Sequence, residues 1–270
     1  MKKRCLVALL AAVLCISGLA GCAGSGGQTE TGGDLLAQIR ERGEIVVAME
    51  GTWAPWGYHD ESGQLVGYDV EVAQNIARRL GVEVQFVEGE FNGLLAGLEG
   101  GRYDIMVNGI DVDEDRKEKY DFSTPYAYNR TVVIVSGDND SIRSMEDLKD
   151  KSTANTLQST YAGVAERYGA DVTGVDDFIQ TIELLTSGRI DATLNAEVSY
   201  YDYMAQHPDA GIKIACIDPA ATQVAIPLRK GEGSAGLLAA VNEALDEMAG
   251  DGTLTDLSIK YFGMDISKDR

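Results

Sequence analysis

The chain has 270 residues, and its 43 Asp and Glu residues outnumber its 23 Lys and Arg residues, which gives a net charge of −20 at pH 7. A protein this acidic should repel nucleic acid and anionic lipid, so partners of these kinds are not expected. The chain beyond residue 33 is long enough for one large domain or two ordinary ones.

The N-terminal residues predict export. Three basic residues at 2–4 precede an apolar run at 5–14, and small residues follow. This order is typical of a secretory signal peptide. The segment LAGC at 19–22 also has the form of a lipoprotein cleavage box. Residues 1–21 are therefore the predicted lipoprotein signal peptide, and Cys22 is the predicted lipidated first residue of the mature chain.

The alternative for this segment is an uncleaved membrane anchor. A transmembrane helix needs about 20 apolar residues, whereas this run is shorter and is broken by Ser17 and Gly18. Residues 22–33 (CAGSGGQTETGG) cannot bury a core, and they predict a lipid-anchored flexible tether. We therefore expect a folded protein that starts near Asp34, lies outside the cytoplasm and is anchored to the cell membrane.

Two segments of the chain repeat one pattern. FNGLLAGLEGGRYDIMVN at 91–108 aligns without gaps with FIQTIELLTSGRIDATLN at 178–195, and six of the 18 positions are identical. Each copy predicts a helix with apolar residues at helical spacing, a Gly stop and a short apolar strand. The segments upstream, at 72–88 and 163–175, both predict a helix, a Gly turn and an alternating strand. The repeated order favours two similar α/β lobes.

Between the two copies, the stretch DVDEDR at 111–116 places one arginine among four acids. One interpretation is a solvated helix start, whose acids suit the positive end of the helix dipole. The other is an anion-binding role for Arg116. Composition alone favours neither interpretation.

Two β-rich runs predict the connection between the lobes. TVVIVSG at 131–137 and TQVAIPLRK at 222–230 predict strands that form a two-stranded hinge, and a helix is expected at 234–249. Lobe one is then discontinuous. The predicted boundaries are 34–133 plus 224–270 for lobe one, and 134–223 for lobe two with the hinge strands.

The sequence also contains a GxGxxG motif at 231–236, after a predicted strand and before a predicted helix. A dinucleotide site of this type requires a second strand after the helix. Only about 20 residues follow the helix, and none of them predicts such a strand. We therefore expect no nucleotide and no other cofactor.

Disulfide and metal chemistry are not expected either. Three of the four cysteines lie in the signal peptide or at the lipid site, so Cys216 has no intramolecular partner. Cys216 lies in the apolar segment IKIACI, which predicts a small buried core residue and not a reactive thiol. The two histidines, His59 and His207, do not make a soft-metal site with it.

Two long segments resemble the amino-acid-binding, family 3 solute-binding proteins of ABC importers. They are EGTWAPWGYHDESGQLVGYDVEVAQNIARRLGV at 50–82 and GGRYDIMVNGIDVDEDRKEKYDFSTPY at 100–126. The resemblance covers 34–266, and QTIELLTSGRIDATLN with the following AEVSYYDYMAQHPDAGIKI looks most like the cystine-binding subfamily. It implies a type II periplasmic-binding-protein fold, in which two α/β lobes joined by a two-stranded hinge close on a ligand.

The resemblance implies ligand-binding roles for three residues of lobe one. Trp53 in EGTWAPW matches the aromatic residue that stacks on the ligand, and Glu50 would face the ligand side chain. Phe91 would close the other face of an aromatic sandwich. Two aromatic walls would remove the apolar part of a ligand from water and attract an ammonium group. The alternative is that Trp53 and Phe91 are core residues.

Arg116 matches the family arginine that binds the α-carboxylate of the ligand. Its planar guanidinium can bind both carboxylate oxygens, and it stays charged at any working pH. Gly109 and Asp111 match positions whose backbone and hydroxyl groups assist this arginine. Ser159 and Thr160 match residues at a helix start in lobe two that donate to the same carboxylate.

The sequence departs from the family pattern at two positions. Ala196 replaces the aspartate that takes the α-ammonium, and Asp111 replaces the usual Ser or Thr of lobe one. Together the two changes can move one carboxylate of the site from position 196 to position 111. Glu197 is a further candidate for the acid that binds the ligand ammonium. A buried acid is costly without a cation, so Asp111 implies either a cationic ligand group or a salt bridge to Arg116.

The leading hypothesis is a monomeric, non-enzymatic receptor that delivers an amino acid, first of all cystine, to an ABC transporter permease. Arg116 requires a carboxylate, whereas Glu50 and Asp111 favour cationic groups, so the alternative ligand is a basic or another polar amino acid. Two other functions stay open. One is an enzyme on the same fold, such as a dehydratase or transglycosylase, with Glu50 or Glu197 as general acid. The other is a ligand-sensing module.

Overall fold

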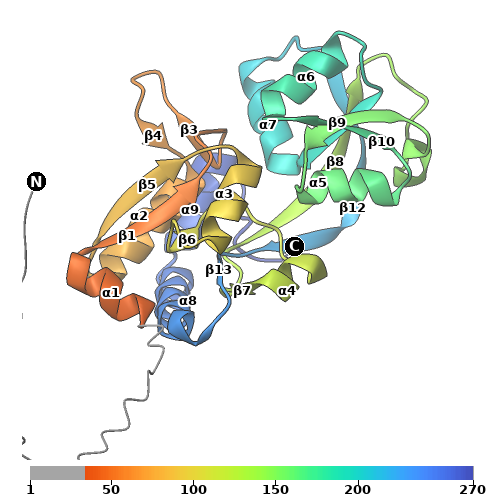
Figure 1. The fold of residues 1–270 in the computed structure, drawn as a ribbon. Helices are drawn as coiled ribbons and strands as arrows, with labels where there is room; N and C mark the ends of the chain where they lie inside the picture. Colours follow the sequence, from red (N-terminus) through yellow and green to blue (C-terminus); the bar gives the residue numbers. More distant parts are fainter. Residues whose placement is uncertain (1–33, 270) are drawn as a thin grey trace, which may run out of the picture. The chain divides into compact units, whose positions relative to one another are not determined.

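The structure, a computed structural model shown as a ribbon in Figure 1, describes residues 34–269. These residues belong to one compact unit. The predicted signal peptide at 1–21, the tether at 22–33 and Cys22 lie outside the described residues. Within the described part, no helix has both the length and the apolar character needed to cross a lipid bilayer.

A three-stranded parallel sheet organises the first part of the chain, with β1 between its two neighbours. In spatial order its strands are β5 (Glu83–Glu88), β1 (Glu44–Met49) and β6 (Ile105–Met106). The helices of this region are α1 (Leu35–Arg42), α2 (Tyr68–Leu80) and α3 (Phe91–Glu99). A small antiparallel sheet follows β1 and comprises β2 (Thr52–Trp53), β3 (Gly57–His59) and β4 (Leu65–Val66).

A five-stranded mixed sheet organises the middle of the chain. In spatial order its strands are β10 (Asp171–Val175), β9 (Ser152–Thr156), β11 (Ala192–Ala196), β8 (Ala127–Ser136) and β12 (Ile212–Val224). The first three run parallel, and β8 is antiparallel to both of its neighbours. Figure 1 shows the helices around this sheet, which are α5 (Thr160–Arg167), α6 (Phe178–Thr186) and α7 (Glu197–Gln206), with the 3-10 helix η1 (Met145–Leu148) before β9.

The structure confirms the predicted repeat. Helices α3 and α6 begin 87 residues apart, and so do the strands β6 and β11 that follow them. Apolar residues at helical spacing attach each helix to its own sheet. Each helix buries the same three positions, Phe91, Leu95 and Leu98 in α3 and Phe178, Ile182 and Leu185 in α6. The predicted α/β fold with two similar lobes is confirmed.

The long strands β8 and β12 pair antiparallel over most of their length, as the predicted two-stranded hinge requires. The prediction of one continuous strand at 222–230 is wrong. Strand β12 ends at Val224, and β13 (Pro227–Arg229) pairs with β7 (Tyr120–Phe122) in a separate sheet. Pro227 has no N–H to donate, so the strand cannot continue through it in the same ladder. The lobe boundaries stay a prediction.

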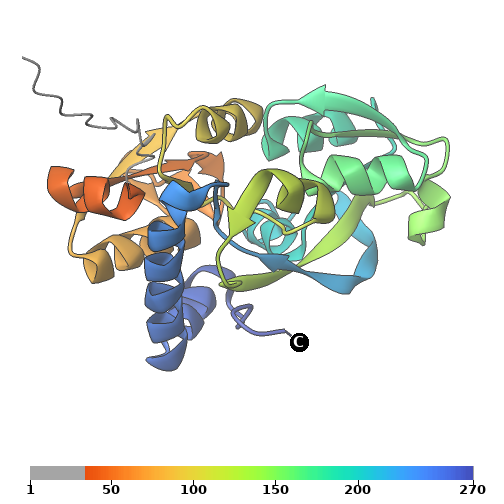
Figure 2. The same ribbon diagram turned by 60° about the horizontal axis from the view of Figure 1, so that its bottom comes forward.

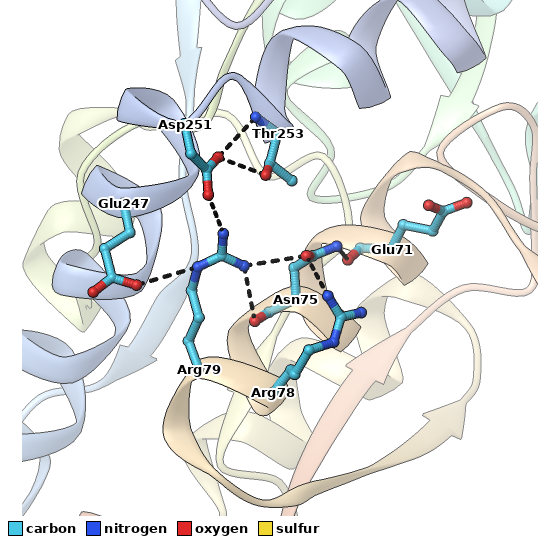
Figure 3. Close-up of polar contacts among 7 residues, drawn as sticks. All are labelled: Glu71, Asn75, Arg78, Arg79, Glu247, Asp251 and Thr253. Carbon is cyan, nitrogen blue, oxygen red and sulfur yellow. Dashed lines mark hydrogen bonds and ion pairs between the residues drawn. The ribbon is translucent and has the colours of Figure 1, made fainter.

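The C-terminal helices pack against α2, as Figure 2 shows for the blue helices. After β13 the chain forms η2 (Glu232–Ser234), α8 (Ala235–Gly250) and α9 (Thr253–Phe262). In the described part no strand follows α8, so the GxGxxG segment lies outside a βαβ unit. Figure 3 shows the polar contacts between α2 and α8, where Arg79 lies 3.3 Å from Glu247 and 2.7 Å from Asp251.

Cys216 is only partly buried, so the prediction of a buried core residue is wrong in degree. It lies in β12, which is the edge strand of its sheet. Its Sγ atom is 3.7 Å from the Sδ atom of Met145, and burial raises the pKa of the thiol to about 11. The thiol therefore stays protonated at neutral pH. Among residues 34–269, no group of three His, Cys, Asp or Glu side chains is placed to hold a metal ion.

Candidate ligand-binding site

A cavity lies at the ends of the parallel strands of both sheets. It measures about 560 Å³ including its opening to solvent, a volume that suits a small molecule. Glu50 follows β1 and Asn108 follows β6, while Asn155 and Asn195 lie near the ends of β9 and β11. Ligands of α/β folds bind at such strand ends because the helix N-termini converge there.

Arg116 lies in the short helix α4 (Glu114–Lys119), but its side chain is only 10% exposed. The interpretation of Arg116 as a solvated residue is therefore wrong. Its Nη1 atom donates to the backbone oxygen of Asp111 at 2.8 Å and to Thr160 Oγ1 at 2.9 Å. Its Nη2 atom donates to the backbone oxygen of Gln158 at 2.8 Å. The guanidinium thus contacts both lobes.

The remaining surroundings of Arg116 are an acid and an aromatic ring. Its Nε atom lies 3.5 Å from Asp113 Oδ2, and its Cζ atom lies 5.7 Å from the centre of the Phe91 ring. A guanidinium has five donors and three are used here, so one donor of Nη2 and the Nε donor, which lies beside Asp113, stay available to a carboxylate. Arg116 has the chemistry of an anion site.

Asp111 is buried beside Arg116, yet the ion pairs of the described residues do not include one between their side chains. The Thr222 hydroxyl donates to Asp111 Oδ1 at 2.7 Å. Burial raises the pKa of Asp111, and the hydrogen bond from Thr222 and the charge of Arg116 oppose this rise. Of the two predicted alternatives, the salt bridge to Arg116 is not found, and the cationic ligand group stays a prediction.

Glu50 is held at the cavity by a reciprocal pair of hydrogen bonds with Asn108. The Asn108 side-chain amide donates to Glu50 Oε2 at 2.8 Å, and the Glu50 backbone N–H donates to Asn108 Oδ1 at 2.7 Å. Burial raises the pKa of Glu50 to about 7; the hydrogen bond from Asn108 lowers it, and the charge of Asp177 raises it further. A ligand cation beside this carboxyl would favour its ionised form.

The predicted aromatic residues take different positions. Trp53 is partly buried and stacks on Trp56, with ring centres 5.4 Å apart. Gly109 has a φ of 55°, and a Cβ atom at this position would lie 2.7 Å from the Trp53 ring, so the loop needs glycine here. Phe91 both lines the cavity and packs in the core beneath α3. The core interpretation therefore holds for Phe91, and its predicted stacking on a ligand stays a prediction.

Eight of the nine predicted ligand-binding residues line this cavity, and their binding roles stay predictions. The eight are Glu50, Trp53, Phe91, Gly109, Asp111, Arg116, Ser159 and Thr160. Ser159 is the N-cap of α5 and accepts a hydrogen bond from Ala162 N at 3.1 Å. The ninth residue, Glu197, is buried in the first turn of α7 and is not among the lining residues.

Asp177 lines the cavity although no sequence pattern used above predicts it as a site residue. It caps α6, and its Oδ1 atom accepts a hydrogen bond from Gln180 N at 2.9 Å. The usable signal is an aspartate directly before a predicted helix, since aspartate is a favoured N-cap. Asn108 and Asn195 carry a second signal, because they are identical in the repeat and both line the cavity near the ends of strands.

The chain is similar to one protein family over most of its length. Residues 45–264 match the bacterial extracellular solute-binding proteins, family 3. The L-cystine-binding protein TcyA of Bacillus subtilis (strain 168) is 39% identical over 271 residues, which cover 98% of this chain and 100% of that protein.

Two solved structures are also similar to this chain over most of its length. An ancestral arginine-binding protein bound to arginine has a TM-score of 0.76 and 38% identity, with 82% of this chain and 99% of that chain covered. The L-cystine solute receptor of Neisseria gonorrhoeae, in the unliganded open conformation, has a TM-score of 0.60 and 37% identity over 88% of this chain and 100% of that chain.

Proposed function

Because the chain belongs to the bacterial extracellular solute-binding proteins, family 3, we propose that it binds a polar amino acid and delivers it to an ABC transporter permease. The fold is the two-lobe type II fold of periplasmic binding proteins. Cystine is the first candidate ligand, since relatives at 39% and 36% identity are named as L-cystine-binding proteins. Anchoring through a lipid on Cys22 and action as a monomer are part of the proposal.

The observation that carries the proposal is one cation in a cavity with several acids. Arg116 lines the same cavity as Glu50, Asp111 and Asp177. An amino acid carries a carboxylate and an ammonium group, so Arg116 would take the first and an acid the second. The lining residues come from both sides of the hinge strands, so a bound ligand would favour the closed arrangement by binding it more tightly.

The ammonium group needs an acid because Ala196 has no charge. Asp111 and Asp177 both line the cavity and are available for this role, one from each lobe. Asp111 is the more deeply buried of the two, since it is 3% exposed. The proposal assigns the ammonium group to this pair of aspartates.

A basic amino acid is the second candidate ligand in the same role. Among the described residues that line the cavity, three are acids, Glu50, Asp111 and Asp177, and one is a cation, Arg116. A ligand with more cationic groups than carboxylates suits this excess of acids, and a similar protein of solved structure is described as bound to arginine. Cystine, with two groups of each sign, leaves its second carboxylate without a cationic side chain among the lining residues.

Catalysis is not part of the proposal. Of the two acids considered as a general acid, only Glu50 lines the cavity, and Glu197 does not. A reaction that needs two acids on opposite sides of a substrate would therefore require another partner for Glu50.

The proposal is tested by calorimetry on purified protein that has been unfolded and refolded to remove carried ligand. We expect one amino acid, cystine first, to bind with one ligand per chain and to raise the melting temperature. Binding of lysine or arginine without cystine would keep the receptor function and exchange the ligand. If neither cystine nor any common amino acid binds, the proposal is wrong.

A further inference from the structure

A second cavity, distinct from the ligand site, gathers positive charge in an acidic protein. It measures about 1010 Å³ including its opening, and Lys119, Arg229 and Lys230 line it. In the described part of the chain, none of these three side chains is found in a salt bridge. Among the side chains that the structure describes, one acid lines the cavity, Glu99, whose Oε1 atom accepts a hydrogen bond from the Tyr120 hydroxyl at 2.8 Å.

Arg229 is fixed in this cavity by its packing. A Cβ atom at Gly101 would lie 2.7 Å from Arg229 Nη1, so the guanidinium lies directly against this glycine. The Nε atom of Arg229 is buried, and no acceptor for it is found among residues 34–269. Arg42 already binds the Asp104 carboxylate. Of the groups that shift the pKa of Asp104, Arg229 has the smallest effect. The Arg229 side chain as a whole is partly exposed and is found in no salt bridge of the described residues, so its charge favours an anion in the cavity.

The start of helix α8 also faces this cavity. Ser234, which precedes α8, is 6% exposed and lines the cavity. Its backbone is helical and its hydroxyl caps no N–H group, and no hydrogen bond of this hydroxyl is found within the described residues. The N–H groups at the start of a 16-residue helix attract anions. The carboxylate of Asp34 lies near Gly236 but is not among the lining groups.

We infer that this cavity binds a phosphate group through Arg229, Lys119 and Lys230, with the Ser234 hydroxyl and the start of α8 as further donors. A phosphate has several acceptor oxygens, which matches a guanidinium, two ammonium groups and a hydroxyl better than a single carboxylate does. The GxGxxG segment, which has no role at the amino-acid site, supplies Gly231, Gly233 and Ser234 to this cavity. The inference is independent of the proposed function.

Two sources of the phosphate group are tested separately. Leu35, in the first helix of the described chain, also lines the cavity. A phospholipid headgroup of the anchoring membrane is one source, and a soluble phosphate compound is the other. Both present the same group to the same side chains.

The experiment is calorimetric titration of the purified protein with inorganic phosphate at low ionic strength. We expect saturable binding of one phosphate per chain, weakened at least about tenfold in Arg229→Gln and in the double variant Lys119→Gln/Lys230→Gln. Glu99→Gln should strengthen binding severalfold because it removes the acid of the cavity. The matched control is Lys213→Gln, which removes one charge from an exposed pair with Asp140 and should leave phosphate binding unchanged.

A second measurement separates the two sources and the two sites. Phosphate binding together with sedimentation on phosphatidylglycerol vesicles, but not on phosphatidylcholine vesicles, identifies a headgroup, and phosphate binding without sedimentation identifies a soluble ligand. Arg116→Ala should leave phosphate binding intact. The inference is wrong if the unmodified protein does not bind phosphate, or if Lys213→Gln weakens binding as much as the double variant. If Arg229→Gln does not fold, the double variant decides.

Discussion

The Arg116 guanidinium and the Thr160 hydroxyl are joined by a hydrogen bond of 2.9 Å, although 44 positions separate the two residues. Gln158, whose backbone oxygen also accepts from Arg116, has a φ of 62°. This left-handed conformation is uncommon for a residue other than glycine, and such strain gathers at functional sites. Arg116 is thus already in contact with the start of α5. A ligand carboxylate that binds Arg116 would lie beside these hydrogen bonds.

Arg116→Ala should weaken amino-acid binding at least about 100-fold, or roughly 3 kcal/mol, because it removes the only cation among the described residues that line the cavity. The affinity of Arg116→Lys should lie between those of the unmodified protein and Arg116→Ala, since an ammonium keeps the charge but loses the bidentate geometry. Calorimetry measures both effects. Lys117→Ala, which removes an exposed cation next in sequence, should bind normally. Unchanged binding in Arg116→Ala would exclude Arg116 as the carboxylate partner.

Asp177→Asn should weaken binding about tenfold while the melting temperature changes little. Asparagine keeps the N-cap acceptor for α6 but removes the charge offered to the ligand ammonium. The control is Glu90→Gln at the equivalent position of the repeat, which precedes α3, is exposed and does not line the cavity. If the two variants bind equally well, Asp177 acts only as a helix cap.

The affinity for a ligand with a cationic side chain should rise as the pH increases from about 6 to about 8. Burial holds the pKa of Glu50 at about 7, so this carboxyl becomes negative over that range and then attracts the cation. Calorimetry at several pH values should show a rise of up to about tenfold per unit below the pKa of Glu50. In Glu50→Gln the rise should disappear. A rise of the same size in the variant would mean that another group titrates.

Asp69 should make the protein less stable as the pH increases from about 4 to about 7. Burial raises the pKa of this carboxyl to about 7 from an ordinary value of 3.8, and the hydrogen bonds from Tyr126 and Gly109 only partly oppose the rise. The folded protein therefore keeps a proton that the unfolded chain has released, so the free energy of unfolding falls through this range. Asp69→Asn should remove this part of the pH dependence.

Urea denaturation at pH 5, 6 and 7, compared between the unmodified protein and Asp69→Asn, measures this effect as roughly one kcal/mol per unit of pH. Asp140→Asn serves as the control. The pKa of Asp140 is lowered from 3.8 by Lys213, so it does not titrate in this range. The same slope in all three proteins would mean that Asp69 is ionised in the folded state.

Arg79→Met should lower the free energy of unfolding by about 1 kcal/mol. Arg79 is 18% exposed and joins α2 to Glu247 of α8 and to Asp251, the C-cap of α8, as Figure 3 shows. These acids are 59% and 50% exposed, so solvent weakens the pairs. The loss should shrink at high salt. Arg78→Met, which removes an exposed arginine bonded within α2, should cost less than half as much. Equal losses would mean that the contacts with α8 contribute nothing.

The sequence by itself predicted the elements of both lobes and most of the cavity. Phe91 and Phe178 begin the repeated helices because apolar spacing is a local property that survives in the fold. Arg116, Trp53 and Thr160 were found through the resemblance, since the short motifs that contain them stand at strand ends and helix starts. The end of β12 at Val224 and the start of β13 in another sheet at Pro227 were not predicted, because the whole run at 222–230 is β-rich.

The tertiary structure alone decided which groups are partners and which are charged. Asp111 accepts a hydrogen bond from the Thr222 hydroxyl, although 111 positions separate the two residues. Arg116 donates to the backbone oxygen of Asp111 and not to its carboxylate. Asp177 lines the cavity and Glu197 does not, although both lie at helix starts. Burial and hydrogen bonding depend on neighbours that are distant in sequence, so a pattern can name the acids of a site but cannot say which of them are ionised.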